Sequence, residues 1–153
     1  MRQEVLFPEE LRPSRELPVL AVQKDIVYHG TFARNVLNGP EVTGMGFWSI
    51  NPYVGCAFGC AYCYARYAHR YVMERAAAAD KLEGEISRDF RDMPPWLAFE
   101  RHIFVKQNAP TLLRRTLRHG SARHLALAEG ECIVIGTATD PYQPAERRFR
   151  ITR

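Results

Sequence analysis

From residue 45 onward, short apolar segments alternate with segments that have helical features. The apolar segments lie at residues 45–50, 102–105 and 132–137. Helical features follow in the alanine-rich residues 65–81, from Asn108 to Gly120, and from about Ala145. Such alternation is typical of parallel strands that are connected by right-handed crossover helices. The sequence therefore predicts an α/β fold, either an open sheet or a barrel, containing three strand–helix units.

Three units are too few to close a barrel, and their sheet would keep an exposed edge. The last expected helix also reaches Arg153 without a Gly, Asn or Pro that would end it. We therefore expect this chain to be truncated relative to the functional protein, or to need a partner at that edge. Residues 1–40 contain four prolines and no strong periodicity, so we predict an irregular N-terminal extension with short elements, among them a short strand at residues 26–28, before a core of residues 41–153. Residues 84–96 are expected to form a loop.

Composition and charge narrow the class of protein. No apolar stretch reaches the roughly 18 residues of a membrane helix, and the N-terminus opens on charged residues rather than an apolar leader. These features predict a cytoplasmic protein that does not enter the membrane. The net charge is +4, and residues 101–123 carry six Lys and Arg residues without Asp or Glu. That stretch is either a solvated helix face or a surface that contacts phosphates.

Three of the four cysteines lie within eight residues, at positions 56–63, which read Cys-Ala-Phe-Gly-Cys-Ala-Tyr-Cys. In a reducing compartment, such clustering indicates metal binding or catalysis rather than disulfides. Three thiolates on one loop can hold three corners of a cubane iron–sulfur cluster. Cys132 is expected at the opposite end of the parallel sheet, as a buried core thiol. One iron would therefore stay open for a substrate or cofactor.

The spacing Cys56-x3-Cys60-x2-Cys63, with Tyr62 before the last cysteine, resembles the signature of the radical S-adenosylmethionine (SAM) superfamily. Three further segments resemble its branch of spore photoproduct lyase and DNA repair photolyases. They are residues 34–38 (Arg-Asn-Val-Leu-Asn), 51–56 (Asn-Pro-Tyr-Val-Gly-Cys) and 139–146 (Thr-Asp-Pro-Tyr-Gln-Pro-Ala-Glu). The resemblance covers about residues 34–153. It implies the first three βα units of a partial (β/α)6 barrel, with a [4Fe–4S] cluster at the end of the first strand.

The resemblance also implies a reaction and a set of site residues. SAM would bind the open iron, and an electron from a flavodoxin-like or ferredoxin-like donor would release a 5′-deoxyadenosyl radical in a lyase-like enzyme, with DNA as a candidate substrate. The resemblance makes Cys56, Cys60 and Cys63 the iron ligands. It implies cofactor contacts at Tyr62, Lys106, Asn108, Thr139 and Asp140. Gln143 and Glu146 match the branch pattern without an assigned role, and no catalytic residue is identified.

Two other interpretations remain open. With His69, the cysteine run extends to C-x3-C-x2-C-x5-H, a donor set that a Cys3His zinc site would use. A small zinc-binding module could then bind nucleic acid through the basic stretch after Arg101 and nearby aromatic residues. Structural zinc sites usually separate two pairs of ligands by a longer gap, which this run lacks. The other alternative is an inactive fragment that binds a cluster without turnover.

Overall fold

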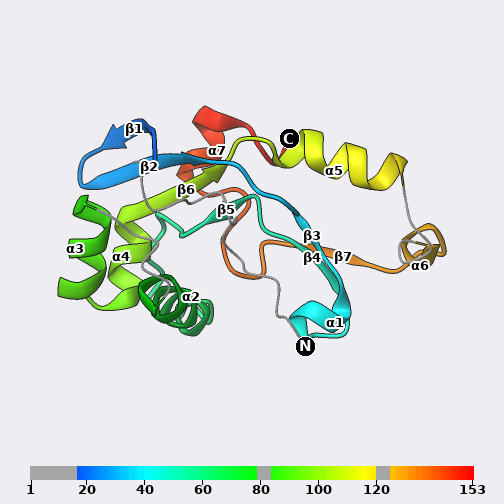
Figure 1. Ribbon diagram of the computed structural model, residues 1–153, viewed down its shortest axis with the longest axis horizontal. Helices are drawn as coiled ribbons and strands as arrows, with labels where there is room; N and C mark the ends of the chain where they lie inside the picture. Colours follow the sequence, from blue (N-terminus) through cyan, green and yellow to red (C-terminus); the bar gives the residue numbers. More distant parts are fainter. Residues whose placement is uncertain (1–16, 79–83, 120–124) are drawn as a thin grey trace.

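The computed structural model describes residues 17–78, 84–119 and 125–153, which form a mixed α/β arrangement around two open sheets (Figure 1). In the larger sheet the strand order is β1 (Val19–Gln23), β2 (Ile26–Thr31), β6 (His102–Lys106) and β5 (Tyr53–Val54). In the smaller sheet it is β3 (Leu37–Asn38), β4 (Trp48–Ile50) and β7 (Ile133–Ile135). The predicted α/β class is confirmed, and neither sheet closes on itself.

The three strands expected from the sequence are present, but they do not share one sheet. β4 and β7 pair in parallel, from Trp48 opposite Ile133 to Ile50 opposite Ile135. β6 lies in the larger sheet instead, parallel to β2 and antiparallel to β5. The short strand expected at residues 26–28 is confirmed as part of β2, whereas β1 and the place of β2 as an internal strand of the larger sheet were not expected of an irregular extension. The apolar residues of β2 are buried by pairing with β6, a long-range contact that has no local signal.

The chain passes from one sheet to the other at Asn51 and Pro52, between β4 and β5. Proline has no N–H group for a sheet ladder, so the strand is interrupted there. The Pro52 carbonyl accepts the Lys106 N–H at 3.2 Å, which joins the bend to the end of β6. β5 ends immediately before the cysteine motif, so this crossover places the motif beside the larger sheet.

The helices expected after the strands are confirmed, and further helices were not predicted. The structure has α1 (Pro40–Thr43), α2 (Arg66–Ala78), α3 (Gly84–Asp92), α4 (Pro95–Arg101), α5 (Ala109–Arg118), α6 (Leu125–Ala128) and α7 (Pro144–Phe149). The predicted loop at 84–96 is wrong because the two prolines separate two helices, and Pro95 occupies the first turn of α4. α3 packs through Phe90, whose ring centroid lies 5.6 Å from that of Phe99 in α4.

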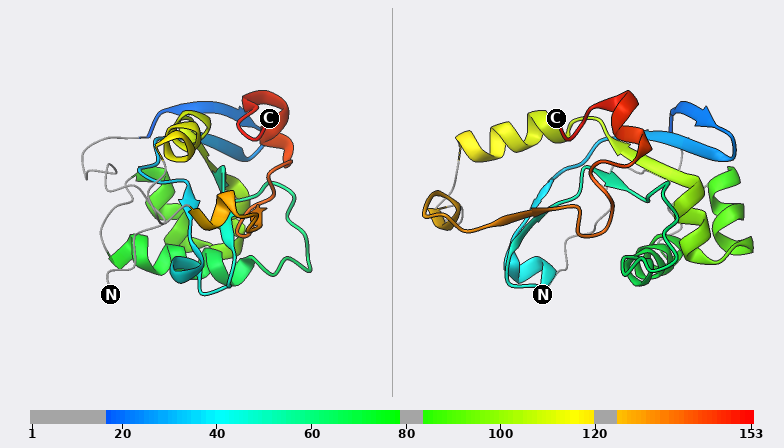
Figure 2. Two further views of the ribbon diagram at one scale, coloured as in Figure 1. Left: turned by 90° about the vertical axis from the view of Figure 1, so that its right-hand side faces the viewer. Right: turned by 180° about the vertical axis from the view of Figure 1, so that it is seen from behind.

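Two buried clusters hold these elements together. In one, α7 covers a face of the larger sheet, and Tyr28, Tyr53, Ile103, Val105 and Ala145 are buried there. In the other, α5 packs on the smaller sheet around Val36, Leu37, Trp48, Ile50 and Ala109. Helices α2, α3 and α4 lie on the side of the larger sheet opposite to α7 (Figures 1 and 2). In the described ranges, no helix has the length and apolar character needed to span a membrane.

Candidate metal centre

Residues 55–64, here called the cysteine loop, connect β5 to α2 and carry the three clustered cysteines. The loop is irregular, and Cys56, Cys60 and Cys63 are partly buried in it. It begins at Gly55, whose φ of 85° lies in the left-handed region. The loop therefore leaves the end of β5 through a backbone conformation that favours glycine.

Close packing also requires glycine at position 55. A Cβ atom there would lie 2.6 Å from the carbonyl oxygen of Phe99 and 2.8 Å from that of His102. The following N–H, of Cys56, donates to the same Phe99 carbonyl at 3.1 Å. The end of α4 thus fixes the direction in which the loop starts.

Residues 136–146, here called the docking segment, hold the loop from the other side. Thr139 Oγ1 donates to the Gly55 carbonyl at 2.6 Å, and Gln143 Nε2 donates to the same oxygen at 3.0 Å. Gln143 Oε1 accepts the Ala57 N–H at 3.1 Å, and Gln143 Nε2 also lies 2.9 Å from Thr139 Oγ1. Gln143 is completely buried. The segment therefore binds the peptide groups on both sides of Cys56.

Other contacts fasten the docking segment to β4, the cysteine loop and α2. The Asn51 side chain donates to Thr137 Oγ1 and accepts the Ala138 N–H, both at 2.9 Å. The Tyr64 hydroxyl donates to the Thr137 carbonyl at 2.9 Å. His69 Nε2 lies 3.2 Å from the Ala138 carbonyl. Together these contacts bring residues 137–143, which directly follow β7, against the beginning of the cysteine motif.

Glu146 anchors the far end of the docking segment at α7. Its buried carboxylate accepts the Tyr53 hydroxyl and the backbone N–H groups of Ile151, Thr152 and Arg153. Burial alone would raise the pKa of Glu146, but these hydrogen bonds, led by that of Tyr53, favour the carboxylate and hold its pKa below the ordinary 4.5. The charged form of Glu146 thus ties β5, α7 and the residues after α7 together.

The thiol of Cys56 is partly desolvated and lies near Asp140 and Cys63. Burial raises its pKa, and the negative charges of Asp140 and Cys63 act in the same direction, whereas the N–H groups of Phe58 and Asp140 oppose it. A metal ion would reverse this balance because it stabilises the thiolate. The Asp140 carboxylate also accepts the Tyr142 N–H at 2.7 Å, which shapes the turn beside Cys56.

The three cysteine side chains are of the chemical kind that binds an iron–sulfur cluster, but they are not gathered around a common centre. Three soft thiolates on one loop are the ligands that such clusters use. Across the described residues, however, no three His, Cys, Asp or Glu side chains are gathered closely enough to hold a metal ion. Binding would therefore require the thiol groups of Cys56, Cys60 and Cys63 to come closer together.

The residues predicted to contact the cofactor fall into different environments. Tyr62 is 90% exposed on the cysteine loop. Thr139 and Asp140 belong to the docking segment and lie beside the beginning of the cysteine loop. Lys106 is buried at the end of β6, where Nζ donates to the Asn51 carbonyl at 2.7 Å, and burial lowers its pKa to about 8. Lys106 therefore contacts the residue that also binds the docking segment.

Asn108 has a different role from the expected helix cap. It occupies the N-cap position of α5, but its side chain makes no capping hydrogen bond. Instead, Oδ1 accepts the Ala33 N–H at 2.8 Å and Nδ2 donates to the Ala33 carbonyl at 2.7 Å. Both polar ends of the side chain are thus used to connect α5 to the segment between β2 and β3.

The structure also corrects or refines two expectations about possible metal ligands. Cys132 is exposed rather than buried, because it precedes the short edge strand β7. It precedes Ile133, which pairs with Trp48 at the beginning of β4, whereas the chain leads toward the cysteine loop from the other end of β4, as predicted. His69 is buried and stacks on Phe99 at a centroid distance of 4.3 Å. Burial lowers the pKa of His69, and its Nε2 contacts the Ala138 carbonyl.

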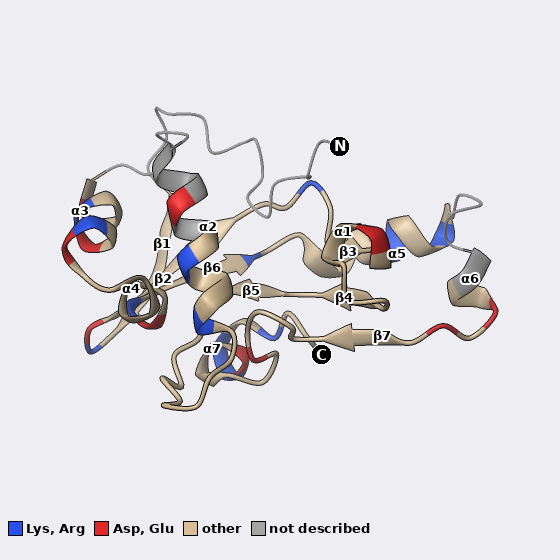
Figure 3. Cartoon of the chain, turned by 90° about the horizontal axis from the view of Figure 1, so that it is seen from below, with Lys and Arg blue, Asp and Glu red and all other residues tan. Residues whose placement is uncertain are grey.

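The basic stretch at residues 101–123 does not behave as a single face over its described part. Arg101 forms ion pairs with Asp89 at 3.2 Å and Glu85 at 3.5 Å, and Lys106 is buried. Arg114 and Arg115 are exposed on α5. Figure 3 shows acidic and basic residues together on α3. This separation weakens the case for a continuous phosphate-binding surface.

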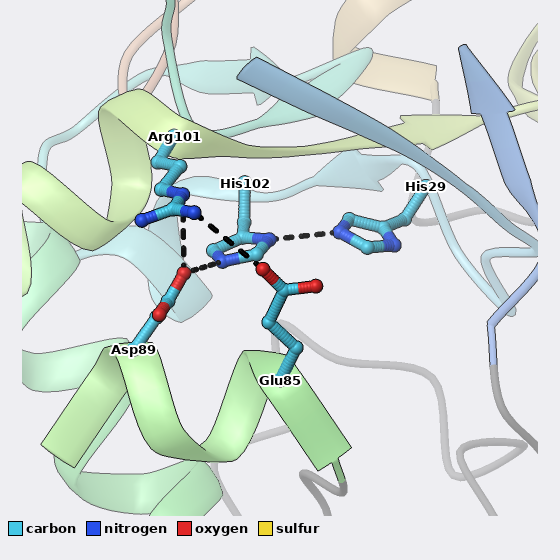
Figure 4. A network of polar contacts seen from close by, with 5 residues as sticks. All are labelled: His29, Glu85, Asp89, Arg101 and His102. Atoms are coloured by element: carbon cyan, nitrogen blue, oxygen red, sulfur yellow. Dashed lines mark hydrogen bonds and ion pairs between the residues drawn. The ribbon is translucent and has the colours of Figure 1, made fainter. Parts of the chain in front are cut away.

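A second polar network lies between α3 and the larger sheet (Figure 4). Asp89 Oδ2 is 2.6 Å from His102 Nε2, and His102 Nδ1 is 2.9 Å from His29 Nε2. The Asp89 carboxylate accepts the proton carried by His102 Nε2, and the proton between His102 Nδ1 and His29 Nε2 belongs to one ring or the other according to the tautomer. Burial, together with the nearby His102, lowers the pKa of His29 to about 4. This network is therefore built around a neutral His29.

Comparisons with known proteins place this chain among uncharacterized relatives. It is 31% identical over 128 residues to uncharacterized proteins of Mycobacterium tuberculosis and Mycobacterium bovis, a match that covers 82% of this chain and 30% of each relative. An uncharacterized protein of Methanocaldococcus jannaschii is 25% identical over 121 residues, covering 79% of this chain and 34% of that protein. The chain thus spans about a third of the length of these relatives. No family model and no solved structure matches it significantly.

The sequence analysis left Gln143 and Glu146 without a role and did not single out Asn51 or Tyr53. All four residues lie in the two segments, 51–56 and 139–146, that carry the resemblance. The signal in the sequence that could have indicated a role for them is that both segments contain polar residues among apolar ones. Their contacts join β4, β5 and the cysteine loop to residues about ninety positions later, and no local pattern specifies such a pairing.

Proposed function

We propose that this chain carries the cluster-binding part of a radical SAM enzyme of the spore-photoproduct-lyase-like branch. Its main support is that two segments which resemble this branch, and which are distant in sequence, contact each other in the fold. Gln143 and Thr139 of the second segment bind Gly55 and Ala57, on either side of Cys56 in the first. A chance likeness of either segment would not require these residues to meet.

In this proposal Cys56, Cys60 and Cys63 hold three irons of a [4Fe–4S] cluster, and the fourth iron binds SAM. When bound, the cluster would supply the electron that cleaves SAM to methionine and a 5′-deoxyadenosyl radical, after reduction by a flavodoxin-like or ferredoxin-like protein. A reducing, cytoplasmic location suits such a site. The proposed reaction is lyase-like, and the resemblance to the spore-photoproduct-lyase-like branch makes nucleic acid the proposed substrate.

The chain's own residues would orient the cofactor in distinct ways. The exposed ring of Tyr62 is available to stack on the adenine of SAM. Lys106 would offer a buried ammonium group to the SAM carboxylate, since one Asn51 carbonyl uses only one of its donors. Thr139 acts through Gly55 and Asp140 shapes the turn beside Cys56, so both would position the cluster end of the site. Asn108 would support the adjacent α5 through Ala33.

The proposed fold is the first part of a radical SAM barrel, with β4 and β7 as two of its parallel strands. The described strands form two open sheets, so the barrel and the substrate site would need further strands. The relatives matched by this chain are about three times as long. The activity of the whole protein is therefore part of the proposal.

Metal analysis after anaerobic purification tests this function. We expect a brown protein with about four iron and four sulfide per chain, and loss of both in Cys56→Ala, Cys60→Ala and Cys63→Ala. Cys132→Ala is the matched control, because this exposed cysteine lies outside the loop, and it should keep the wild-type metal content. A colourless protein with one tightly bound zinc would overturn the proposal in favour of the zinc-binding nucleic-acid module.

Release of 5′-deoxyadenosine from SAM under reducing conditions tests the second half of the proposal. We expect release by cluster-loaded protein and none by the three cysteine variants in the loop. A stable cluster without SAM cleavage, in this chain and in a full-length relative alike, would contradict the enzyme assignment and favour a cluster-binding scaffold.

A further inference from the structure

We infer that Thr139 and Gln143 are positioning residues that hold Cys56 as a fixed metal ligand, onto which Cys60 and Cys63 close when metal binds. The inference deepens the proposed function and rests on it for the identity of the metal. The arrangement of the polypeptide around Cys56 can nevertheless be measured without any metal. The three cysteines would thus have unequal roles, which their sequence spacing does not indicate.

The backbone around Cys56 is held from three directions. Its own N–H donates to the Phe99 carbonyl of α4 at 3.1 Å. The preceding carbonyl, of Gly55, accepts both Thr139 Oγ1 and Gln143 Nε2. The following N–H, of Ala57, donates to Gln143 Oε1 at 3.1 Å. These partners come from α4 and the docking segment, so tertiary structure, not the loop itself, sets the position of Cys56.

The peptide groups of the other two cysteines are held by contacts close in sequence, and the long-range contacts of this part of the loop are made by the neighbouring side chains of Tyr64 and Arg66. Cys63 N–H donates to the Cys60 carbonyl at 3.0 Å, and the Arg66 N–H donates weakly to the Cys63 carbonyl at 3.4 Å. The Arg66 guanidinium lies 3.4 Å from the Gly59 carbonyl and forms an ion pair with Glu100 at 3.1 Å. A turn whose peptide groups bond only to one another can reorient at lower cost than one whose peptide groups are bound by other elements, as at Cys56. Cys60 and Cys63 can therefore move together as a unit.

Gln143 suits this role because its amide offers both a donor and an acceptor. Its two ends pair with the Gly55 carbonyl and the Ala57 N–H of the cysteine loop. The side chain is completely buried, so water does not replace these hydrogen bonds when they are lost. Methionine has a similar length and no amide, so Gln143→Met removes the hydrogen bonds with little change in volume.

Amide hydrogen exchange in the metal-free protein tests the fixed position of Cys56. We expect the Ala57 N–H to exchange much more slowly than the Cys63 N–H in the wild type. In Gln143→Met the Ala57 N–H should exchange roughly tenfold faster, while Val105 N–H in β6 reports on any global loss of stability. Gln23→Met, the same change at an exposed position of β1, is the control and should leave Ala57 unchanged.

Equal exchange rates of Ala57 and Cys63 in the wild type would overturn the inference, as would an unchanged Ala57 rate in Gln143→Met. If that variant fails to fold, Thr139→Val removes one of the two hydrogen bonds to Gly55 with nearly the same shape. It should raise the exchange rate of Cys56 and Ala57 by a smaller factor of about three. No effect of Thr139→Val on either amide would then contradict the inference.

The cluster-loaded protein supplies the second measurement. We expect Gln143→Met to load iron but to lose it to a chelator several-fold faster than wild type or Gln23→Met, with a changed electron paramagnetic resonance spectrum. Loss rates and spectra identical to the wild type would contradict the positioning role. Failure of the wild type to bind iron would instead refute the proposed function, while the exchange data would still decide whether Cys56 is held as inferred.

Discussion

Replacing Gly55 by alanine tests how strongly the start of the cysteine loop is constrained. The backbone φ of 85° costs an L-residue about 1–2 kcal/mol. The new Cβ would also lie 2.6 Å from the Phe99 carbonyl oxygen and 2.8 Å from that of His102. Both contacts are with backbone, so α4 and β6 would have to move apart, at a further cost of about 1–3 kcal/mol. The two costs together amount to about 2–5 kcal/mol, and we expect a destabilisation near the middle of this range, about 3–4 kcal/mol.

Urea unfolding of the metal-free protein, followed by circular dichroism, measures this loss. With a slope of about 2 kcal/mol per molar for a small domain, the midpoint should fall by about 1.5–2 M. Gly44→Ala is the matched control, because its φ is +67° and a Cβ there meets nothing within 4 Å. That variant should lose only about 1–2 kcal/mol, which is the conformational cost alone.

The difference between the two variants isolates the effect of close packing at Gly55. Equal midpoint shifts for Gly55→Ala and Gly44→Ala would refute the argument that α4 and β6 confine the loop at this point. A large loss in Gly55→Ala with unchanged cluster loading would show that the loop start supports folding without controlling the metal site.

Three further predictions concern buried ionisable groups. Glu146→Gln should lower the free energy of unfolding at pH 7 by about 1–3 kcal/mol. Because the pKa of Glu146 is lowered in the folded protein, the stabilisation by its carboxylate is lost as the pH falls below about 4.5. The urea midpoints of wild type and variant should therefore converge in acid. The pKa of His29 is lowered to about 4 in the folded protein, so on acidification the unfolded chain takes up a proton at this residue before the folded chain does. The free energy of unfolding should therefore fall from pH 6.5 toward pH 4. His29→Gln should reduce this fall, as measured by urea midpoints at pH 7 and pH 5. Burial lowers the pKa of Lys106 to about 8, so the free energy of unfolding of the wild type should rise between pH 8 and pH 10.5. That of Lys106→Met should not rise in this way. Equal pH profiles of the two proteins would contradict burial of the charge.

Local signals predicted much of the secondary structure. Alanine-rich sequence predicted α2, and Asn108 located the beginning of α5, because helix propensity and the residue preferences of helix ends act within a few residues. Prolines were misleading at 84–96, where they separate α3 from α4. A breaker marks the boundary of an element, but it does not show whether the neighbouring residues are helical.

Strand pairing could not be predicted in the same way. The segments containing β4, β6 and β7 were recognised by their apolar residues, yet β6 pairs with β2 and β5 while β7 pairs with β4. The free energy of a strand depends on which neighbours cover its faces. An apolar strand is compatible with several partners, so its sheet is decided only when the whole chain packs.

The sequence by itself determined that three thiols lie on one short loop, because a spacing of a few residues limits how far apart they can be. It also supplied the glycine that the start of the loop needs. Tertiary structure alone decided that Thr139 and Gln143 bind the peptide groups beside Cys56. These hydrogen bonds join residues more than eighty positions apart, and they form because β4 and β7 pair and α7 packs on β5, which brings buried polar groups together where water cannot satisfy them.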